Sequence, residues 1–483
     1  MWGKDENISE VNLSAHKIGT GAAEALGNAL RRSLSITTLD CSLNPALGDE
    51  GARLLVPALR TDGTGISTIR KLSLMRCGIG VVGATALAQG LRRNSVLERL
   101  NLTGNCLGDL GTIALAGSLV GPSRGFLLGL WLSSNGIGPI GAEGFAEGLA
   151  KAPALRELHI SGNALGGVGV AILVRGAVQG RGLRGLYASG CGVDNAGAKE
   201  IANALKGSRH LDTLCLGYNL IGDDGVSALT REVAENNSLK RLLLSSNCLR
   251  AAGGKAIAAM LLSNCGLLCL DVSNNRLSAT GIEAVATAVA KNTTLLELDL
   301  SGCGGTEASF QAMTRAVEAN NTLGVLLYAD NHLSADSLIE LEYAMGRPKR
   351  SVREVMMQVQ RAIDKQDLLS NGQEIRQSTK GIKRSQGREP SVTLGSGQET
   401  SVQVSFGRKD NIIGSITVTN ETCLEEARAL IAPLLRPSER TYGFLSAAGG
   451  LIPSDDEQAR RVVWDCKIPV QLRPASWVAI EHI

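Results

Sequence analysis

The chain has 483 residues, more than one ordinary domain needs, and a net charge of +3. A charge so close to neutral provides no bulk attraction to nucleic acid or to an acidic membrane surface. Apolar residues make up 44% of the chain, which is ample for a continuous core, whereas aromatic residues make up 3% and glycines number 58. This composition favours an array of small, regular layers over an irregular core.

A repeat of about 28 residues runs through most of the chain. Residues 97–108 (LERLNLTGNCLG), 155–166 (LRELHISGNALG) and 239–250 (LKRLLLSSNCLR) share the pattern L-x-x-L-x-L-x-x-N-x-L. Self-similarity at such a period indicates a solenoid or another repeat architecture. The interval is 28 residues except for 33 after Ile36 and 30 after Leu97. The first apolar residue of the twelve copies falls at Ile8, Ile36, Ile69, Leu97, Leu127, Leu155, Leu183, Leu211, Leu239, Leu267, Leu295 and Leu323.

Each copy is predicted to hold a short strand followed by a helix. The L-x-x-L-x-L segment predicts a strand whose leucines point into the core. In residues 278–294, Ile282, Val285 and Val289 fall on one helical face. Strands stack at about 4.8 Å and helices at about 8–10 Å, so the stack must bend with its strands inside. We therefore predict an α/β horseshoe with an inner parallel sheet and outer helices.

An asparagine ends the strand segment in most copies. We expect its amide to turn inward and to bond to backbone groups that the turn leaves unpaired. Cysteine, which is small and a weak donor, takes this place at Cys77, Cys191 and Cys303, and His16 takes it in the first copy. The asparagine that follows His159 and Ser161 is therefore predicted to be structural. The position is occupied by Asn44, Asn105, Asn135, Asn163, Asn219, Asn247, Asn275 and Asn331.

The side chains that face the hollow come from the third, fifth and seventh positions, because strand side chains alternate. At the fifth position Trp131, His159 and Tyr187 follow one another in consecutive copies. Exposed aromatic side chains clustered in an aromatic-poor chain suggest a hot spot for binding a partner. We expect Leu243 and, near the rim, Tyr218 to extend this hot spot. Coincidence, or cover by the chain's own C-terminal segment, remains the alternative.

Charge is also graded along the predicted hollow. Lys71, Arg76 and Arg99 mark the early copies, and Arg241 lies further on. The late copies carry acidic residues. This gradient suits either a plain solvated face or a docking surface with two signs of charge. The acidic residues are Asp271, Glu297, Asp299 and Asp330.

Known catalytic patterns are missing from the sequence. There is no H-E-x-x-H and no G-x-S-x-G, and AAGGKA at 251–256 lacks the first glycine and the hydroxyl residue of a phosphate-binding loop. The five histidines are scattered, and Ser161 belongs to a position that is serine in most copies. We therefore predict no enzyme, no metal site and no cofactor.

The repeats, with their G-x-x-G-A turn at Gly138, Gly141 and Ala142, resemble the ribonuclease-inhibitor class of leucine-rich repeats over residues 8–346. This resemblance is specific for the fold and weak for function. The class includes inhibitors, Ran GTPase-activating proteins, innate immune receptors and axonemal scaffolds. Activation of a GTPase would need a loop residue such as Arg60 or Arg124, and the acidic tail of that family is missing.

The C-terminal third changes character after residue 346. Residues 347–369 predict a helix, with a capping box at Ser351 and Glu354, that closes the array or docks a partner helix. Residues 370–398 read as a polar, basic linker and 476–483 as a tail. In residues 399–475 the order β-β-α-β-β resembles a ubiquitin-like β-grasp domain, a module that usually binds another protein. No terminal Gly-Gly is present.

Location and function follow from these patterns as expectations. The first residues have no secretory signal pattern, and no run of 18 apolar residues occurs. Cys77, Cys191 and Cys303 should lie roughly 20 Å apart, too far for disulfides, which favours a reducing cytoplasm. We predict a non-enzymatic scaffold or adaptor. The resemblance to axonemal scaffolds implies a component of a cilium or flagellum, and a GTPase regulator or an inhibitor or immune sensor remains the alternative.

Overall fold

The computed structural model describes residues 8–61, 67–120, 126–331 and 333–346, and five strands in the region from 400 to 474. The chain divides into two units, Met1–Lys365 and Gln366–Ile483. Among the described residues, no helix has the length and apolar character needed to cross a lipid bilayer.

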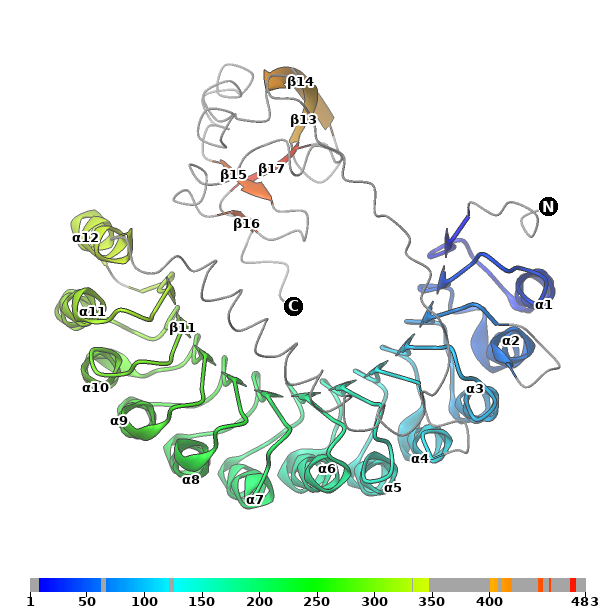
Figure 1. Ribbon diagram of the computed structural model, residues 1–483, viewed down its shortest axis with the longest axis horizontal. Helices are drawn as coiled ribbons and strands as arrows, with labels where there is room; N and C mark the ends of the chain where they lie inside the picture. The colour runs from blue at the N-terminus through cyan, green and yellow to red at the C-terminus, as the bar shows by residue number, and fades with distance from the viewer. Residues whose placement is uncertain are drawn as a thin grey trace, which may run out of the picture. The chain divides into compact units, whose positions relative to one another are not determined.

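The first unit contains twelve strands in one parallel sheet, ordered β1 to β12 as along the chain. Within this unit the strands line the inner side of an arc and the helices lie outside (Figure 1). The predicted α/β horseshoe of twelve repeats is confirmed. The strands are β1 Glu10–Asn12, β2 Thr38–Asp40, β3 Lys71–Ser73, β4 Arg99–Asn101, β5 Gly129–Trp131, β6 Glu157–His159, β7 Gly185–Tyr187, β8 Thr213–Cys215, β9 Arg241–Leu243, β10 Cys269–Asp271, β11 Glu297–Asp299 and β12 Val325–Leu327.

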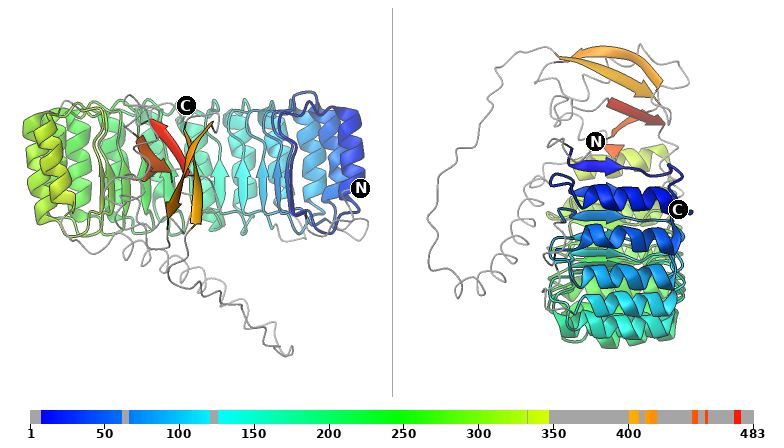
Figure 2. Two further views of the ribbon diagram at one scale, coloured as in Figure 1. Left: turned by 90° about the horizontal axis from the view of Figure 1, so that it is seen from above. Right: turned by 90° about the vertical axis from the view of Figure 1, so that its right-hand side faces the viewer.

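The outer layer has one helical segment per repeat, and these helices lie side by side (Figure 2). In the second repeat the helix continues as a short 3-10 turn, η2 Val56–Leu59. The helices are α1 Thr20–Leu30, α2 Gly48–Leu55, α3 Val81–Leu91, α4 Gly108–Ser118, α5 Pro139–Leu149, α6 Gly166–Gly180, α7 Asn195–Leu205, α8 Asp223–Glu235, α9 Ala251–Ser263, α10 Ser278–Val289, α11 Glu307–Ala319 and α12 Ala335–Gly346.

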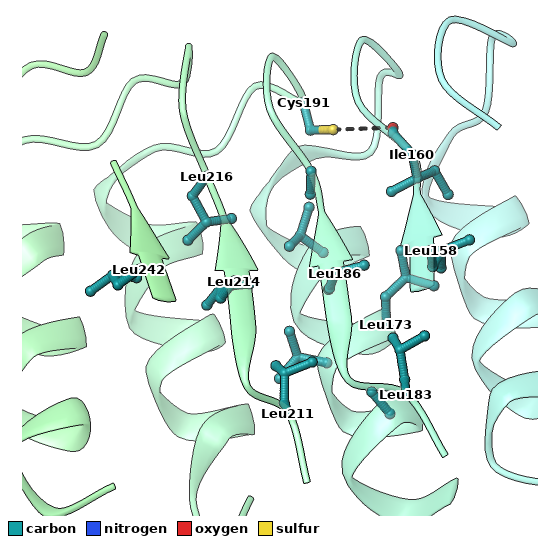
Figure 3. Packing of buried hydrophobic residues seen from close by; sticks show 14 of the residues in the cluster. Leu158, Ile160, Leu173, Leu183, Leu186, Cys191, Leu211, Leu214, Leu216 and Leu242 are labelled. Atoms are coloured by element: carbon teal, nitrogen blue, oxygen red, sulfur yellow. Dashed lines mark hydrogen bonds between the residues drawn. The ribbon is translucent and has the colours of Figure 1, made fainter. Parts of the chain in front are cut away.

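The core lies between sheet and helices and is built from the repeat leucines. Leu158, Leu186 and Leu214 occupy the same place in β6, β7 and β8 and are fully buried (Figure 3). Each buried leucine stabilises the fold by about 1.5–3 kcal/mol relative to an exposed one. Because every layer has apolar side chains at the same places, the core is continuous from repeat to repeat.

The asparagines form a buried ladder beside this core. The Oδ1 of Asn163 accepts the N–H groups of Asn135 and Ile137 at 2.9 and 3.0 Å. In the seventh repeat the thiol of Cys191 donates to the carbonyl of Ile160 at 3.6 Å, as predicted for the cysteine copies (Figure 3). The prediction for the first copy holds only in part. The ring of His16 bonds through Nδ1 to the carbonyl of Ser14 at 2.7 Å, but the side chain is exposed, because β1 is the edge strand of the described sheet.

A second ladder, which the sequence analysis missed, joins the helices. Asp109 in the first turn of α4 caps the next helix, α5, where its Oδ1 accepts the N–H groups of Gly138 and Gly141 at 2.7 and 2.9 Å. A Cβ at Gly141 would lie 2.6 Å from that oxygen, which explains the glycine. Asp49 caps α3 and Asp223 caps α9 in the same way. The starts of α3, α5 and α9 are thus held by the preceding repeat, whereas α7 is capped by Asp194 of its own repeat.

The second unit contains a five-stranded sheet ordered β14-β13-β17-β15-β16. Strands β13 and β17 are parallel, and the other pairs are antiparallel. The helix expected at 423–435 lies outside the described residues, as do 347–399 and 475–483. The β-grasp assignment, the closing helix and the linker therefore stay predictions. The strands are β13 Thr400–Phe406, β14 Asn411–Val418, β15 Tyr442–Leu445, β16 Leu451–Ile452 and β17 Val470–Pro474.

Candidate functional site

Three aromatic side chains stack along the inner face of the sheet. Trp131, His159 and Tyr187 occupy the last residue of β5, β6 and β7 and are in register with one another. The indole and imidazole rings lie 4.9 Å apart at 13°, and the imidazole and phenol rings 4.0 Å apart at 4°. The geometry expected from the repeat spacing is confirmed. These three residues are called the aromatic ladder below.

Two glycines, which the sequence analysis overlooked, make room for the ladder. Gly129 precedes Trp131 by two residues, and Gly185 precedes Tyr187 by two. A Cβ on Gly129 would lie 2.6 Å from the indole Cη2, and one on Gly185 would lie 3.0 Å from the phenol Cε2. The two large rings therefore fold back over glycine backbone. The sequence signal for this packing was a glycine at the third position of the two copies that have Trp131 and Tyr187 at the fifth position.

Each ring of the ladder also carries a polar atom. Within the residues that the structure describes, no hydrogen bond engages the indole N–H of Trp131, the ring nitrogens of His159 or the hydroxyl of Tyr187. The three side chains are half-buried. A molecule bound here would thus meet apolar ring edges together with hydrogen-bond donors and acceptors on neighbouring strands.

Burial governs the protonation of the central ring. It lowers the pKa of His159 from 6.5 to about 4, so the imidazole is neutral near pH 7. Burial also raises the pKa of the Tyr187 hydroxyl, with the Glu157 carboxylate adding to the effect. The stack is therefore uncharged at neutral pH.

The lowered pKa of His159 predicts how the stability of the fold depends on pH. The unfolded chain binds a proton at His159 near pH 6.5, whereas the folded chain does so only near pH 4. Stability from this group is therefore complete above about pH 6.5 and is lost as the pH falls towards 4. We expect His159→Gln to flatten the loss of stability in this range, measured by urea unfolding. His210→Gln serves as a comparison, because burial and then Arg184 also lower the pKa of His210, and this substitution should therefore change the pH dependence in the same direction.

An NMR titration of the His159 ring provides an independent check. A measured pKa above 6.5 would contradict the prediction. It would mean that attraction between a protonated imidazole and the two flanking ring faces outweighs the cost of burial.

The apolar surface continues past Tyr187. Cys215 on β8 and Leu243 on β9 follow it in register, and both are half-buried. Tyr218 lies in the turn after β8, with φ at 54° and 56% of its surface exposed. It stands at the rim of the sheet, as the sequence predicted, and is not part of the stack.

Charged residues from both ends of the predicted gradient lie on the sheet. Lys71 and Arg99 are in register on β3 and β4, and both are exposed. Asp271 and Asp299 are in register on β10 and β11, and burial raises the pKa of Asp299. Glu297 lies beside them on β11, and Arg241 opens β9.

Some predicted residues lie apart from the sheet. Arg76 is exposed in the turn after β3, with φ at 52°, so it belongs to the rim. Asp330 occupies the same kind of turn after β12, with φ at 56°. Arg60 follows η2 at the edge of the array, and Arg124 lies outside the described residues.

The buried thiols are not reactive groups. Burial raises the pKa of Cys77 and of Cys191 to about 11 and that of Cys303 to about 12, so all three are protonated at neutral pH. All nine cysteines that the structure describes are free. Over the same part of the chain, no group of three His, Cys, Asp or Glu side chains is placed to hold a metal ion.

Comparison with known proteins adds to this geometry. A family model described as "Leucine Rich repeat" matches residues 65–88, 93–116, 152–173, 207–229, 235–258, 263–286 and 291–304. The array thus has the leucine-rich-repeat fold. The ribonuclease inhibitor of Sus scrofa is 31% identical over an alignment of 145 residues, and the match covers 24% of this chain and 31% of the relative. NACHT, LRR and PYD domains-containing protein 12 of Mus musculus is 32% identical over 143 residues, 30% of this chain and 13% of the relative. The repeats therefore span less than a third of each relative.

Two solved structures also match the chain. An internalin from Listeria monocytogenes is 18% identical and covers 67% of this chain and 88% of its own, with a TM-score of 0.38. Leiomodin-1 actin-binding site 2 is 24% identical and covers 29% of this chain and 82% of its own, with a TM-score of 0.25.

Proposed function

We propose that the concave face of the array binds a protein partner and that the aromatic ladder is the centre of the contact. The observation that carries this proposal is the stack of Trp131, His159 and Tyr187 over two glycines. The fold does not need large rings at this place, because other repeats have Asn101 or Asp271 there. Large rings in a preformed stack bury much area at little entropic cost, as interface hot spots do.

The repeat architecture supports a protein as the partner. Solenoids use their extended concave surface for binding, and that surface is the inner sheet here. One relative is named an inhibitor of ribonuclease, and so acts on another protein. We propose the same general mode, a non-enzymatic scaffold or adaptor, without proposing ribonuclease as the target.

Charge would orient the partner along the sheet. Lys71 and Arg99 lie on one side of the aromatic ladder, and Asp271 and Asp299 lie on the other. A partner with an acidic region facing β3 and β4 and a basic region facing β10 and β11 fits this arrangement. Such complementarity would raise the association rate and fix the direction of binding.

A double substitution tests the proposal. We expect Trp131→Ala with Tyr187→Ala to weaken partner binding at least about thirtyfold, because two hot-spot side chains are removed. Proteins recovered by proximity labelling with wild type and lost with this variant would be purified and their affinities measured. The control is Leu110→Ala with Ile140→Ala, which removes apolar side chains that are 67% and 65% exposed on the outer helices.

The control pair should bind like wild type. If the same partners bind both variants with wild-type affinity, the aromatic ladder is not the centre of an interface. Circular dichroism would show that each variant keeps its fold.

A finer proposal concerns location. We propose that the chain is a scaffold in the axoneme of a cilium or flagellum, a proposal that rests on the resemblance of the repeats alone. We also propose that the C-terminal module binds a second partner. Cofractionation of the chain with isolated axonemes would support it. A chain that stays entirely in the detergent-soluble fraction of ciliated cells would count against it.

A further inference from the structure

The aromatic ladder ends at Tyr187, although the sheet continues. The ring of Tyr187 stacks on His159, and among the residues that the structure describes it makes no second ring contact. On the next strand, β8, Cys215 is in register with Tyr187, and on β9 Leu243 is in register with Cys215. The place where a fourth ring would continue the stack is therefore occupied by a short thiol side chain.

The strand spacing leaves room for one aromatic ring beside Tyr187. Neighbouring strands lie about 4.8 Å apart, close to the ring separations of 4.9 and 4.0 Å within the ladder. Tyr187 and Leu243 are two strands apart, which separates their backbones by about 10 Å. A ring that touches one side chain on each face needs about 7–8 Å. Tyr187, Cys215 and Leu243 are all half-buried, so each keeps part of its surface open.

The thiol does not cover the phenol face that looks towards β8. The Sγ of Cys215 lies 3.1 Å from the Oγ of Ser189, which follows Tyr187 by two residues. The phenol ring folds the other way, over Gly185, which precedes Tyr187 by two residues. On β8 the residue in register with Gly185 is Thr213, a small side chain that is only 6% exposed. Thr213 thus forms the floor beside the ring, and the thiol lies nearer the end of the strand.

Charge beside Tyr187 favours a ring over a basic side chain. Among the third- and fifth-position residues of β7, β8 and β9, only Arg241 is charged, and it is exposed. Its guanidinium would repel a lysine or an arginine of a partner, whereas a guanidinium is attracted to the face of an aromatic ring. Glu157 lies on β6, on the other side of Tyr187, and Asp212 already accepts the hydroxyl of Thr213 at 2.9 Å.

We propose that an aromatic side chain of the protein partner stacks on Tyr187 over β8 and becomes the fourth ring of the aromatic ladder. Tyr187 would contact one face of this ring, and Leu243 with the guanidinium of Arg241 would contact the other. The thiol of Cys215 would meet the edge of the ring, a contact that sulfur and aromatic rings favour. This inference rests on the proposed function, because it names the group that the ladder receives from the partner.

Nuclear magnetic resonance of the full chain with labelled leucine methyl groups tests the site. The amides of N-acetyltyrosine, N-acetylleucine and N-acetylarginine serve as single-residue probes, and Leu243→Ile assigns the methyl signals of Leu243. We expect the tyrosine probe to shift these signals saturably, because its ring lies against Leu243, and to bind more tightly than the other two probes. Tighter binding of the leucine or the arginine probe, or no saturable shift with any probe, would contradict the proposal.

A variant that fills the place with a ring of the chain itself locates the site. Cys215→Phe should weaken binding of the tyrosine probe at least about tenfold. Should this variant fail to fold, Arg241→Gln changes an exposed side chain and should weaken binding about two- to fivefold. The matched control is Asn101→Phe, which adds the same ring in register with Trp131, at the opposite end of the ladder. Equal weakening in the control would overturn the proposal.

A partner recovered by the proximity labelling described above separates this inference from the proposed function. If it binds Cys215→Phe with wild-type affinity but is lost with Trp131→Ala and Tyr187→Ala, the fourth ring is wrong and the proposed function stands. Loss with Cys215→Phe and retention with Asn101→Phe would support both.

Discussion

Replacement of Asn163 by alanine is expected to lower the free energy of unfolding by about 4 kcal/mol. Its Oδ1 accepts the N–H groups of Asn135 and Ile137, and its Nδ2 donates to the carbonyls of Leu132 at 3.0 Å and Ile160 at 2.7 Å. Asn163 is only 3% exposed, so water cannot replace these bonds. Alanine would leave the N–H groups of Asn135 and Ile137 and the carbonyl of Leu132 buried without partners, and the carbonyl of Ile160 with only the thiol of Cys191.

The matched variant for this prediction is Asn163→Cys. Cysteine occupies the same position at Cys191, where its thiol lies 3.6 Å from the carbonyls of Ile160 and Ser189 but has only one proton to donate. It should therefore recover part of the lost stability, leaving a cost of about 2 kcal/mol. Urea unfolding measures the difference, and hydrogen exchange at the amides of Asn135 and Ile137 locates it, because repeat arrays need not unfold in one step. A loss below about 1 kcal/mol for the alanine variant would contradict the account of the ladder.

Gly167→Ala is expected to cost about 3 kcal/mol, an unusually large effect for one added methyl group. A Cβ on Gly167 in α6 would lie 2.0 Å from the Cα of Gly197 in α7. Neither atom is a flexible side-chain end, so the two helices must separate. That separation would disturb contacts along both helices. Thermal unfolding of the full chain measures the effect.

Gly21→Ala is the matched control for the close contact. Gly21 lies in the first turn of α1, with no atom within 4 Å of the place a Cβ would take. Alanine there should be neutral or stabilise the fold by about 0.5–1 kcal/mol, because glycine loses more backbone entropy in a helix. Equal destabilisation by both substitutions would show that helix packing is not the cause.

Much of the fold could be predicted from the repeat pattern. A spacing of 28 residues aligns the copies, and alternation within a strand then assigns each side chain to the core or to the hollow. This is why Leu158 was expected to be buried and His159 to stand between Trp131 and Tyr187, as the structure confirms. The same logic expected His16 to turn inward. It stays exposed, because β1 is the edge strand of the described sheet.

The glycines were harder to interpret from the sequence. Gly141 was assigned to a turn into the helix, but its place is set by the carboxylate of Asp109 from the preceding repeat. Gly129 received no role, although the ring of Trp131 lies over it. The first contact depends on the direction of the Asp109 side chain across to the next helix, and the second on the direction of the Trp131 ring back along its own strand. The pattern of residue types does not specify that direction.

Periodicity alone thus determined the number of layers, the register of the sheet and the order of side chains along the concave face, because stacked copies must place equal positions side by side. Only the tertiary structure decided which side chains meet between layers. It turned the thiol of Cys215 towards Ser189, and it set Gly167 against Gly197. Such contacts depend on ångström-scale distances between neighbouring repeats, which a one-dimensional pattern does not contain.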